Sequence, residues 1–177
     1  MALSDVIELR AGRFIESASL SPTPDASHPF PCYGGNGFRG YAPKYNHEGP
    51  TILIGRQGAL SGNVRRVDGK FYVTEHALIA QTADRLDRDW TTHMLRQMDL
   101  NKYATRGALP GLAAGTLRAL QMPVPALEQQ RETAVVLGLL EALVQEFEAA
   151  LSAERAAHSG LYERYRDRLL AFGEEAA

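Results

Sequence analysis

Side chains suited to contact with nucleic acid gather in and beside the glycine-rich stretch Gly34–Gly40. Arginine can donate two hydrogen bonds to guanine, and asparagine can make two with adenine. The glycines can form tight turns, so we expect a loop that holds these side chains outward. The first set of candidates for DNA contact is Tyr33, Asn36, Arg39, Tyr41 and Lys44.

A second glycine-rich stretch, Gly55–Asn63, resembles a phosphate-binding loop in its glycines but lacks the Gly-Lys-Ser/Thr ending that holds phosphate and magnesium. Its polar side chains nevertheless suit DNA, because base edges specify a sequence and phosphates position the protein. The candidates are Arg56, Gln57 and Asn63 for bases, and Arg65, Arg66 and Lys70 for phosphates. The alternative is an ordinary loop whose arginines pair with nearby acids.

The charge of the chain is distributed unevenly. Residues 1–125 carry 14 Lys and Arg against 11 Asp and Glu, whereas residues 126–177 carry 5 against 10. Between His28 and Lys70 six basic residues stand against two acidic ones. A basic segment of this kind is typical of a surface that binds a polyanion, although a solvated basic face would have the same composition.

Other kinds of site find little support in the sequence. Gly35–Gly40 is a literal GxGxxG, but Pro43 blocks the helix that a dinucleotide-binding motif requires after its third glycine. The five histidines have no metal-ligand spacing, and no GxSxG nucleophile motif is present. Glu75 and His76 lie in a strand-like pattern, which would point them to opposite faces. We therefore expect neither a catalytic site nor a metal site, and no cofactor bound to this chain.

The bulk composition is that of a globular protein of one medium domain with an appendage. The chain has 177 residues, 45% of them hydrophobic, and a single cysteine, Cys32, which excludes an internal disulfide. No stretch approaches the roughly 20 apolar residues of a membrane span, and the N-terminus has no signal-peptide pattern. The expected compartment is the cytoplasm.

The elements that would position the candidate residues indicate an α+β fold, with a mainly β domain over residues 1–125. Alternation and turn residues predict strands in Val6–Ile15, Thr51–Ile54, Asn63–Val67, Lys70–Ala80 and Thr116–Met122. Asp68-Gly69 is a hairpin signal between two of them. The spacing of Leu86, Trp90, Met94 and Leu95 predicts a helix within Asp84–Met98.

A proline-bounded junction then leads into a long helix over residues 126–173. Pro123 and Pro125 cannot sit inside a helix, but a proline just before good helix formers is a normal helix start. Apolar residues recur every three or four positions as in a coiled coil, and Gly160 weakens this pattern. The seam is Leu140, Val144, Phe147, Leu151, Leu161, Tyr165 and Leu169, continuing through His158 and Phe172. A stripe of this length must pack against another helix, and a second copy or another subunit is the expected partner.

Three ordered blocks of the sequence resemble the specificity subunits of type I restriction-modification systems. YGGNGFRGY with NHEGPTILIGRQGALSGNV resembles the centre of a target-recognition domain, and GLAAGTLRALQMPVPALEQQRE resembles its closing segment and the start of the spacer helix. LYERYRDRLLAF resembles the end of that helix. Members of this family usually hold two target-recognition domains separated by two antiparallel helices. The present chain has one domain and one helix, so it resembles half of such a subunit.

The resemblance implies a non-catalytic subunit that reads one half of a bipartite DNA site in the major groove and docks methyltransferase subunits. Adenine methylation, with S-adenosylmethionine as cofactor, would belong to that partner, and a restriction subunit could also join. Two copies packed antiparallel through their helices would read the same half-site on opposite strands, which predicts an interrupted palindrome. The alternative is a protein-interaction scaffold that dimerises through its helix; it predicts little dependence of binding on salt.

Overall fold

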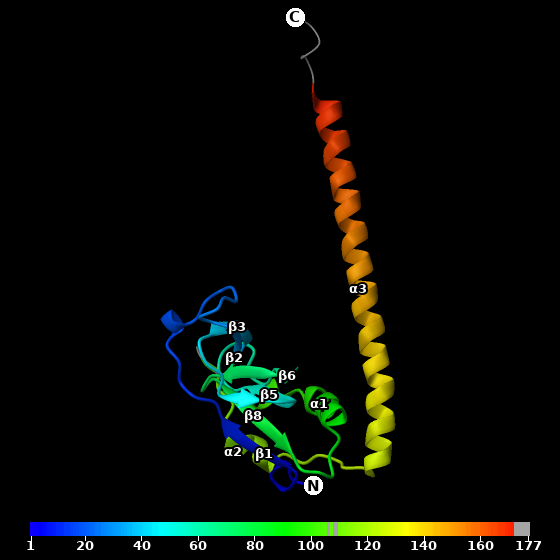
Figure 1. Ribbon diagram of the computed structural model, residues 1–177. Coiled ribbons are helices and arrows are strands. Elements are labelled where there is room, and N and C mark those ends of the chain that lie inside the picture. Colours follow the sequence, from blue (N-terminus) through cyan, green and yellow to red (C-terminus); the bar gives the residue numbers. More distant parts are fainter. Residues whose placement is uncertain (106, 108–109, 172–177) are drawn as a thin grey trace, which may run out of the picture. The chain divides into compact units, whose positions relative to one another are not determined.

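The computed structural model of the chain describes residues 1–105, 107 and 110–171. The chain divides into two compact units, Met1–Ala134 and Val135–Ala177. The strands are β1 (Ile7–Ala11), β2 (Phe30–Gly34), β3 (Gly37–Ala42), β4 (His47–Glu48), β5 (Thr51–Gly55), β6 (Val64–Val67), β7 (Lys70–Val73) and β8 (Ala77–Thr82) (Figure 1). The helices are α1 (Arg88–Gln97), α2 (Ala114–Ala119) and α3 (Leu127–Leu170), with short 3-10 turns η1 (Leu3–Asp5), η2 (Ser17–Ser19) and η3 (Leu100–Tyr103).

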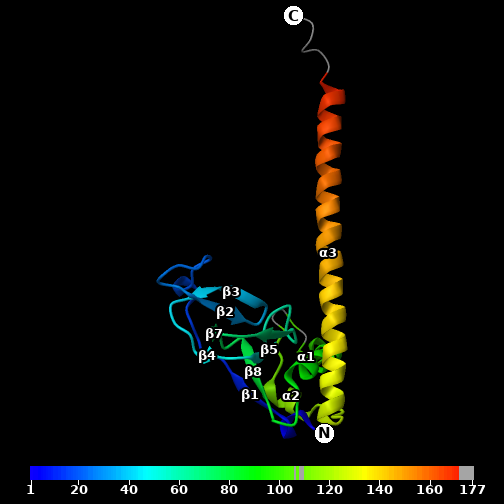
Figure 2. The ribbon, with the colours of Figure 1, turned by 45° about the vertical axis from the view of Figure 1, so that its right-hand side comes forward.

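The strands of the first unit form two four-stranded sheets, which Figure 2 shows from a second side. One sheet has the order β1-β8-β5-β6 with antiparallel pairs throughout, and the other has the order β3-β2-β7-β4. In the second sheet β2 and β7 run parallel, while the β2–β3 and β4–β7 pairs are antiparallel. The α+β class predicted from the sequence, with a mainly β domain and a long C-terminal helix, is confirmed.

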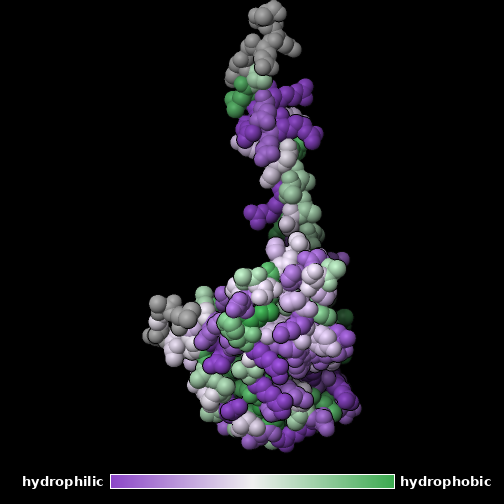
Figure 3. Space-filling view, turned by 60° about the vertical axis from the view of Figure 1, so that its left-hand side comes forward, coloured by the Kyte–Doolittle hydropathy of each residue, from purple (hydrophilic) through white to green (hydrophobic). Residues whose placement is uncertain are grey.

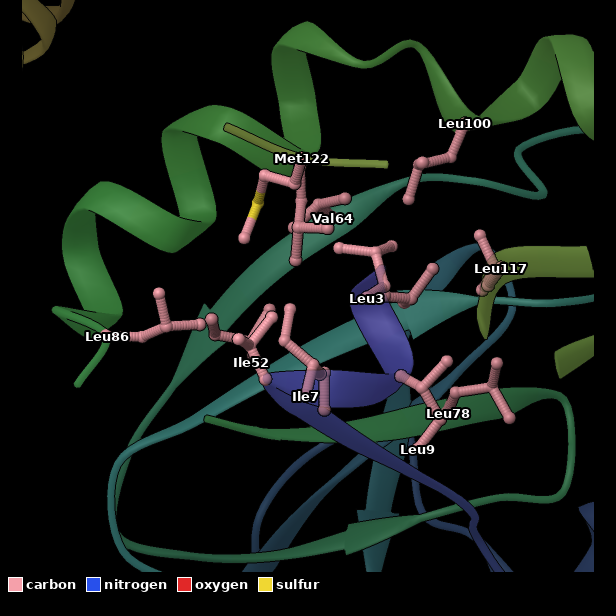
Figure 4. Packing of buried hydrophobic residues seen from close by; sticks show 14 of the residues in the cluster. Leu3, Ile7, Leu9, Ile52, Val64, Leu78, Leu86, Leu100, Leu117 and Met122 are labelled. Carbon is pink, nitrogen blue, oxygen red and sulfur yellow. The ribbon is translucent and has the colours of Figure 1, made fainter. Parts of the chain in front are cut away.

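The main hydrophobic core lies between the first sheet and the segments that cover it. Ile7, Ile52 and Leu78 from the strands pack with Leu3 of η1 and Leu117 of α2 (Figure 4). Helix α1 adds Trp90 and Leu95, both at most 4% exposed, which are two of the residues whose spacing predicted a helix. Its start is set by Asp87, whose carboxylate accepts a hydrogen bond from the Trp90 amide at 2.9 Å, a common N-cap arrangement.

The hairpin prediction at Asp68-Gly69 is wrong, because the strands on either side belong to different sheets. Val64–Val67 pairs with β5 in the first sheet, whereas Lys70–Val73 lies between β2 and β4 in the second. Gly69 has φ +79°, so the turn itself forms as its sequence indicates. The turn directs the chain from one sheet to the other.

The single strand predicted over Lys70–Ala80 is in fact two strands, β7 and β8, separated by a turn. The Ala77 amide donates to the Thr74 carbonyl at 3.1 Å, which closes the turn. Glu75 and His76 therefore do not alternate across a sheet, and the prediction that they face apart is wrong. The His76 Nε2 atom lies 3.0 Å from Glu75 Oε1.

The strand predicted over Thr116–Met122 is also wrong, since Ala114–Ala119 forms helix α2. Leu117 is the fully buried residue of this helix and packs into the main core. Of the predicted strand, only Gln121 keeps β pairing, in an isolated bridge with Ala2.

Helix α3 has 44 residues and continues through Gly160. Its first turn is anchored within the first unit by Gln130, whose side chain is fully buried. The Gln130 amide group donates to the carbonyls of Arg85 at 3.1 Å and Pro125 at 2.9 Å, and its oxygen accepts from the Asp87 amide at 2.8 Å. Phe172 and residue 173 of the predicted helix lie outside the described residues. No helix in the described ranges is long and apolar enough to cross a membrane.

Candidate functional site

The glycine-rich stretch expected to form a loop is a β-hairpin, in which Gly35 and Asn36 form the turn between β2 and β3. Cys32 pairs with Gly40 and Tyr33 pairs with Phe38, so Arg39 is an extra residue opposite this step of the ladder. Gly40 has φ +131°, a conformation that residues with a side chain rarely adopt. A β-bulge re-aims the side chain at its position, and here that side chain is Arg39.

The tip of this hairpin lies directly against the segment that follows β5. The Leu60 amide donates to Asn36 Oδ1 at 3.2 Å. A Cβ atom added at Gly35 would collide with the Gln57 carbonyl oxygen, and one added at Gly55 would collide with the Gly35 carbonyl oxygen. The two glycine-rich stretches recognised in the sequence therefore meet backbone to backbone.

A cavity of about 260 Å³ opens where they meet, and Asn36, Arg39, Gln57 and His76 line it together with Gly35 and Gly58. The His76 Nδ1 atom contacts Gln57 Oε1, so the imidazole links the side chains of Gln57 and Glu75. Arg39 Nη2 donates to Ser17 Oγ at 2.8 Å, which holds the exposed guanidinium beside the cavity. Three side chains predicted as base-reading candidates thus share one concave surface.

His76 is the residue of this surface that the sequence did not identify, since the strand pattern placed it and Glu75 on opposite faces. Its position follows from the turn between β7 and β8, which places the His76 carbonyl 2.9 Å from the Arg56 amide. The sequence signal that could have located it is Thr-Glu-His, a polar break inside an otherwise apolar run.

Several other candidates lie close to the hairpin. Arg65 on β6 is exposed, and its guanidinium approaches Gly37 on β3. Tyr33 does not project outward, because it is half-buried between Phe38 and Phe71, with ring centroids 6.1 and 6.0 Å away. Burial raises the pKa of its phenol, although the charge of Arg65 opposes this effect. Tyr41 packs edge-on against Phe38 at 5.2 Å.

The remaining candidates have other surroundings. Arg66 Nη1 lies 3.2 Å from Asp89 of α1, so the alternative in which these arginines pair with local acids holds for Arg66. Burial of Asp89 opposes its ionisation, but the hydrogen bond from Arg66 and the charges of Arg88 and Arg66 outweigh it and lower the pKa of this carboxyl. Lys70 Nζ lies 5.0 Å from the Tyr45 ring centroid. Lys44 is exposed, Arg56 has a buried Nε, and Asn63 lines a separate cavity with Arg96 and Asn101.

The seam predicted on the long helix lies at the surface of the second unit. The exposed fractions of its side chains range from 47% for Leu161 to 71% for Leu169. His158 lies within the seam, with its Nε2 atom 3.9 Å from Glu154 Oε1 one turn earlier. The apolar seam is therefore available for a partner helix.

Comparison with known proteins identifies the family of the chain. Residues 1–154 match the family described as the type I restriction modification DNA specificity domain. The chain belongs to this family. Membership confirms the resemblance to the family, and the match covers the hairpin, the β5–β6 segment and the first half of α3. The block LYERYRDRLLAF, which begins at Leu161, lies outside the matched residues.

One relative of this type I specificity domain is the specificity subunit of the restriction enzyme EcoprrI from Escherichia coli. It is 43% identical over 141 residues, which cover 80% of the present chain and 35% of the relative. The S subunit from M. genitalium has the same fold, with a TM-score of 0.73 and 18% identity over 99% of this chain and 46% of its own. A chain from a type I R-M system whose structure concerns complex assembly and conformational transition gives a TM-score of 0.69, 17% identity, and coverage of 96% and 44%. The present chain therefore spans less than half the length of these relatives.

Proposed function

We propose that this chain reads one half-site of a DNA sequence in the major groove, using the surface where the β2–β3 hairpin meets the segment after β5. The observation that supports it most directly is the convergence of Asn36, Arg39 and Gln57 on one cavity, in a family of DNA specificity domains. All three side chains suit hydrogen bonding to base edges. Arg65, which lies close to the hairpin, and Lys70 would hold phosphates.

In this proposal the chain has no catalytic role and docks adenine methyltransferase subunits in the cytoplasm. The S-adenosylmethionine cofactor would bind to those subunits, and a restriction subunit could join the assembly. Support comes from the relatives, one of which is a subunit of a restriction enzyme and another of which belongs to a structure of complex assembly. The acidic residues of 126–177 would keep the helix away from DNA while leaving it free to bind protein.

The proposed active form is a homodimer that reads an interrupted palindrome. Its helix exposes an apolar seam suited to a second helix. A twofold axis through paired helices would present identical domains to opposite DNA strands.

Binding to DNA duplexes tests the proposal, with Arg39→Ala as the variant. On a duplex recovered by selection from random sequences, we expect Arg39→Ala to lose about 1–3 kcal/mol of affinity, roughly 5- to 150-fold, and to relax specificity at one base pair. Affinity of the unaltered chain should fall steeply with salt, because phosphate contacts release counterions. Fluorescence anisotropy over a salt series measures both effects.

The matched control is Arg10→Ala. Arg10 is also exposed but lies on β1 in the other sheet, where it pairs with Glu8 at 2.9 Å, so its loss should leave DNA affinity within about twofold. Affinity that is insensitive to salt and to Arg39→Ala would contradict DNA reading at this surface and favour the interaction scaffold.

A further inference from the structure

Two of the three side chains proposed to read bases have their oxygen atoms already engaged by the protein. Asn36 Oδ1 accepts a hydrogen bond from the Leu60 amide at 3.2 Å, and Gln57 Oε1 contacts the Nδ1 atom of His76. The third side chain, Arg39, has only donors. Within the described residues, the groups left for a ligand at this cavity are therefore the amide nitrogens of Asn36 and Gln57 and the guanidinium of Arg39.

The imidazole of His76 lies between two oxygen atoms. Its Nε2 atom is 3.0 Å from Glu75 Oε1, and its Nδ1 atom contacts Gln57 Oε1. An ionised carboxylate and an amide oxygen can only accept hydrogen bonds, so the imidazole that satisfies both contacts donates from each nitrogen. The second carboxylate oxygen of Glu75 is buried and has no hydrogen bond among the described residues, so His76 is the partner on which this carboxylate depends.

The backbone holds Gln57 and His76 beside each other. The Arg56 amide donates to the His76 carbonyl at 2.9 Å, and the Gly58 amide donates to the Pro110 carbonyl at 3.0 Å. The segment that carries Gln57 is therefore fixed to the β7–β8 turn and to the segment before α2. With the backbone fixed on both sides, the contact with His76 decides which end of the Gln57 amide faces the cavity.

The base that a polar surface selects depends on the direction of its hydrogen bonds. On the face of the first unit that Figure 3 shows, hydrophilic side chains predominate and hydrophobic ones form small patches. In the major groove guanine presents two adjacent acceptors, N7 and O6, whereas adenine presents an acceptor and a donor. A glutamine pairs with adenine through both its oxygen and its nitrogen. An amide whose oxygen is already engaged suits guanine instead.

We propose that His76, held by Glu75, is a positioning residue that turns the amide nitrogen of Gln57 toward DNA, so that Gln57 selects guanine rather than adenine. The inference rests on the proposed reading of DNA at this surface and adds its base preference. Asn36 and Arg39 also present donors, so they share the preference. The purines that these three side chains contact in the half-site are guanines.

Selection of binding sites from random duplexes tests the preference. The sites selected by the unaltered chain and by Gln57→Leu should differ at one base pair of the half-site, and the unaltered chain should select G·C there. Replacing that guanine with 7-deazaguanine, which lacks the N7 acceptor, should weaken binding about tenfold. Selection of A·T at this base pair would overturn the inference, as would equal binding of the 7-deazaguanine duplex.

Two substitutions of similar shape test the role of His76. In His76→Asn, an amide nitrogen bonded to Cγ can donate to Gln57 in place of Nδ1, so the preference for guanine over adenine should stay within about twofold. In His76→Asp that place holds an oxygen, which only accepts, so Gln57 turns its nitrogen inward and the preference should fall at least about fivefold.

The readout is a ratio of two dissociation constants, for duplexes that differ only in this base pair. A general loss of affinity, as from the added negative charge of His76→Asp, weakens both duplexes alike and leaves the ratio unchanged. Equal ratios for His76→Asn and His76→Asp would overturn the positioning role of His76.

His28→Leu is the matched control. His28 also pairs with a carboxylate, since its Nδ1 atom lies 3.2 Å from Asp25 Oδ1, but it is not one of the residues that line the cavity. Its loss should leave the ratio unchanged. Enrichment of no sequence by the unaltered chain would contradict the reading of DNA itself, whereas enrichment in which Gln57→Leu changes no base pair would overturn this inference alone.

Discussion

Replacing Gly55 with alanine is expected to destabilise the first unit by about 2–3 kcal/mol, which would lower its melting temperature by roughly 5–10 °C. Gly55 ends β5 and is buried, and an added Cβ would lie against the Gly35 carbonyl group, 3.0 Å from its carbon and nearer still to its oxygen. Both obstacles are backbone, so relief requires the hairpin tip to move away. Because that movement separates Asn36 from Gln57, we also expect DNA affinity to fall by at least tenfold.

Gly115→Ala is the matched control for this prediction. Gly115 lies in α2 of the same unit, has no atom within 4 Å of an added Cβ, and has helical rather than left-handed backbone. The alanine there should be neutral or stabilising by up to about 1 kcal/mol. Thermal unfolding measures the stability of both variants, and fluorescence anisotropy measures their affinity for DNA. A Gly55→Ala protein with unchanged stability and DNA affinity would show that contact between the two glycine-rich stretches does not hold the proposed DNA-binding surface in place.

Replacing Gln130 with leucine is expected to cost about 3 kcal/mol in the free energy of unfolding. Leucine fills a similar volume, but it leaves the Asp87 amide and the carbonyls of Arg85 and Pro125 without the partner that Gln130 provides. Each buried polar group that loses its hydrogen bond costs about 1–3 kcal/mol. Urea denaturation followed by circular dichroism measures the loss.

The neighbouring Gln129 supplies the control for this experiment. It is exposed on the same helical turn, so Gln129→Leu should change stability by less than about 0.5 kcal/mol. Equal stability of the two variants would mean that the buried amide does not hold the start of α3 to the segment before α1.

The parts of the fold that follow from local pattern were predictable from the sequence. The spacing of Trp90 and Leu95 predicted α1, and a run of helix formers after Pro125 predicted α3. The assignment of strands to sheets was not predictable in this way. Asp68-Gly69 has the residues of a hairpin turn, but β7 pairs with β2 and β4 because of contacts between residues distant in the sequence.

The candidate site was predictable in its residue types but not in its geometry. Asn36, Arg39 and Gln57 were recognised from their chemistry in glycine-rich stretches, and the structure brings them together. The bulge at Arg39 depends on the pairing of β2 with β3, and the position of His76 depends on a turn that separates two strands. Tyr33 and Arg66 were also predicted to contact DNA from their residue types, but Tyr33 packs against Phe71 and Arg66 pairs with Asp89. Both neighbours come from other elements, so residue type alone could not predict these contacts.

Selection of binding sites from random duplexes, with the chain and its methyltransferase subunit together, tests the central claim most directly. The account predicts enrichment of an interrupted palindrome, in which one short half-site appears twice in inverted orientation at a fixed spacing. Enrichment of no sequence, or of a single half-site without its inverted repeat, would contradict the account of a domain that reads DNA as a symmetric pair.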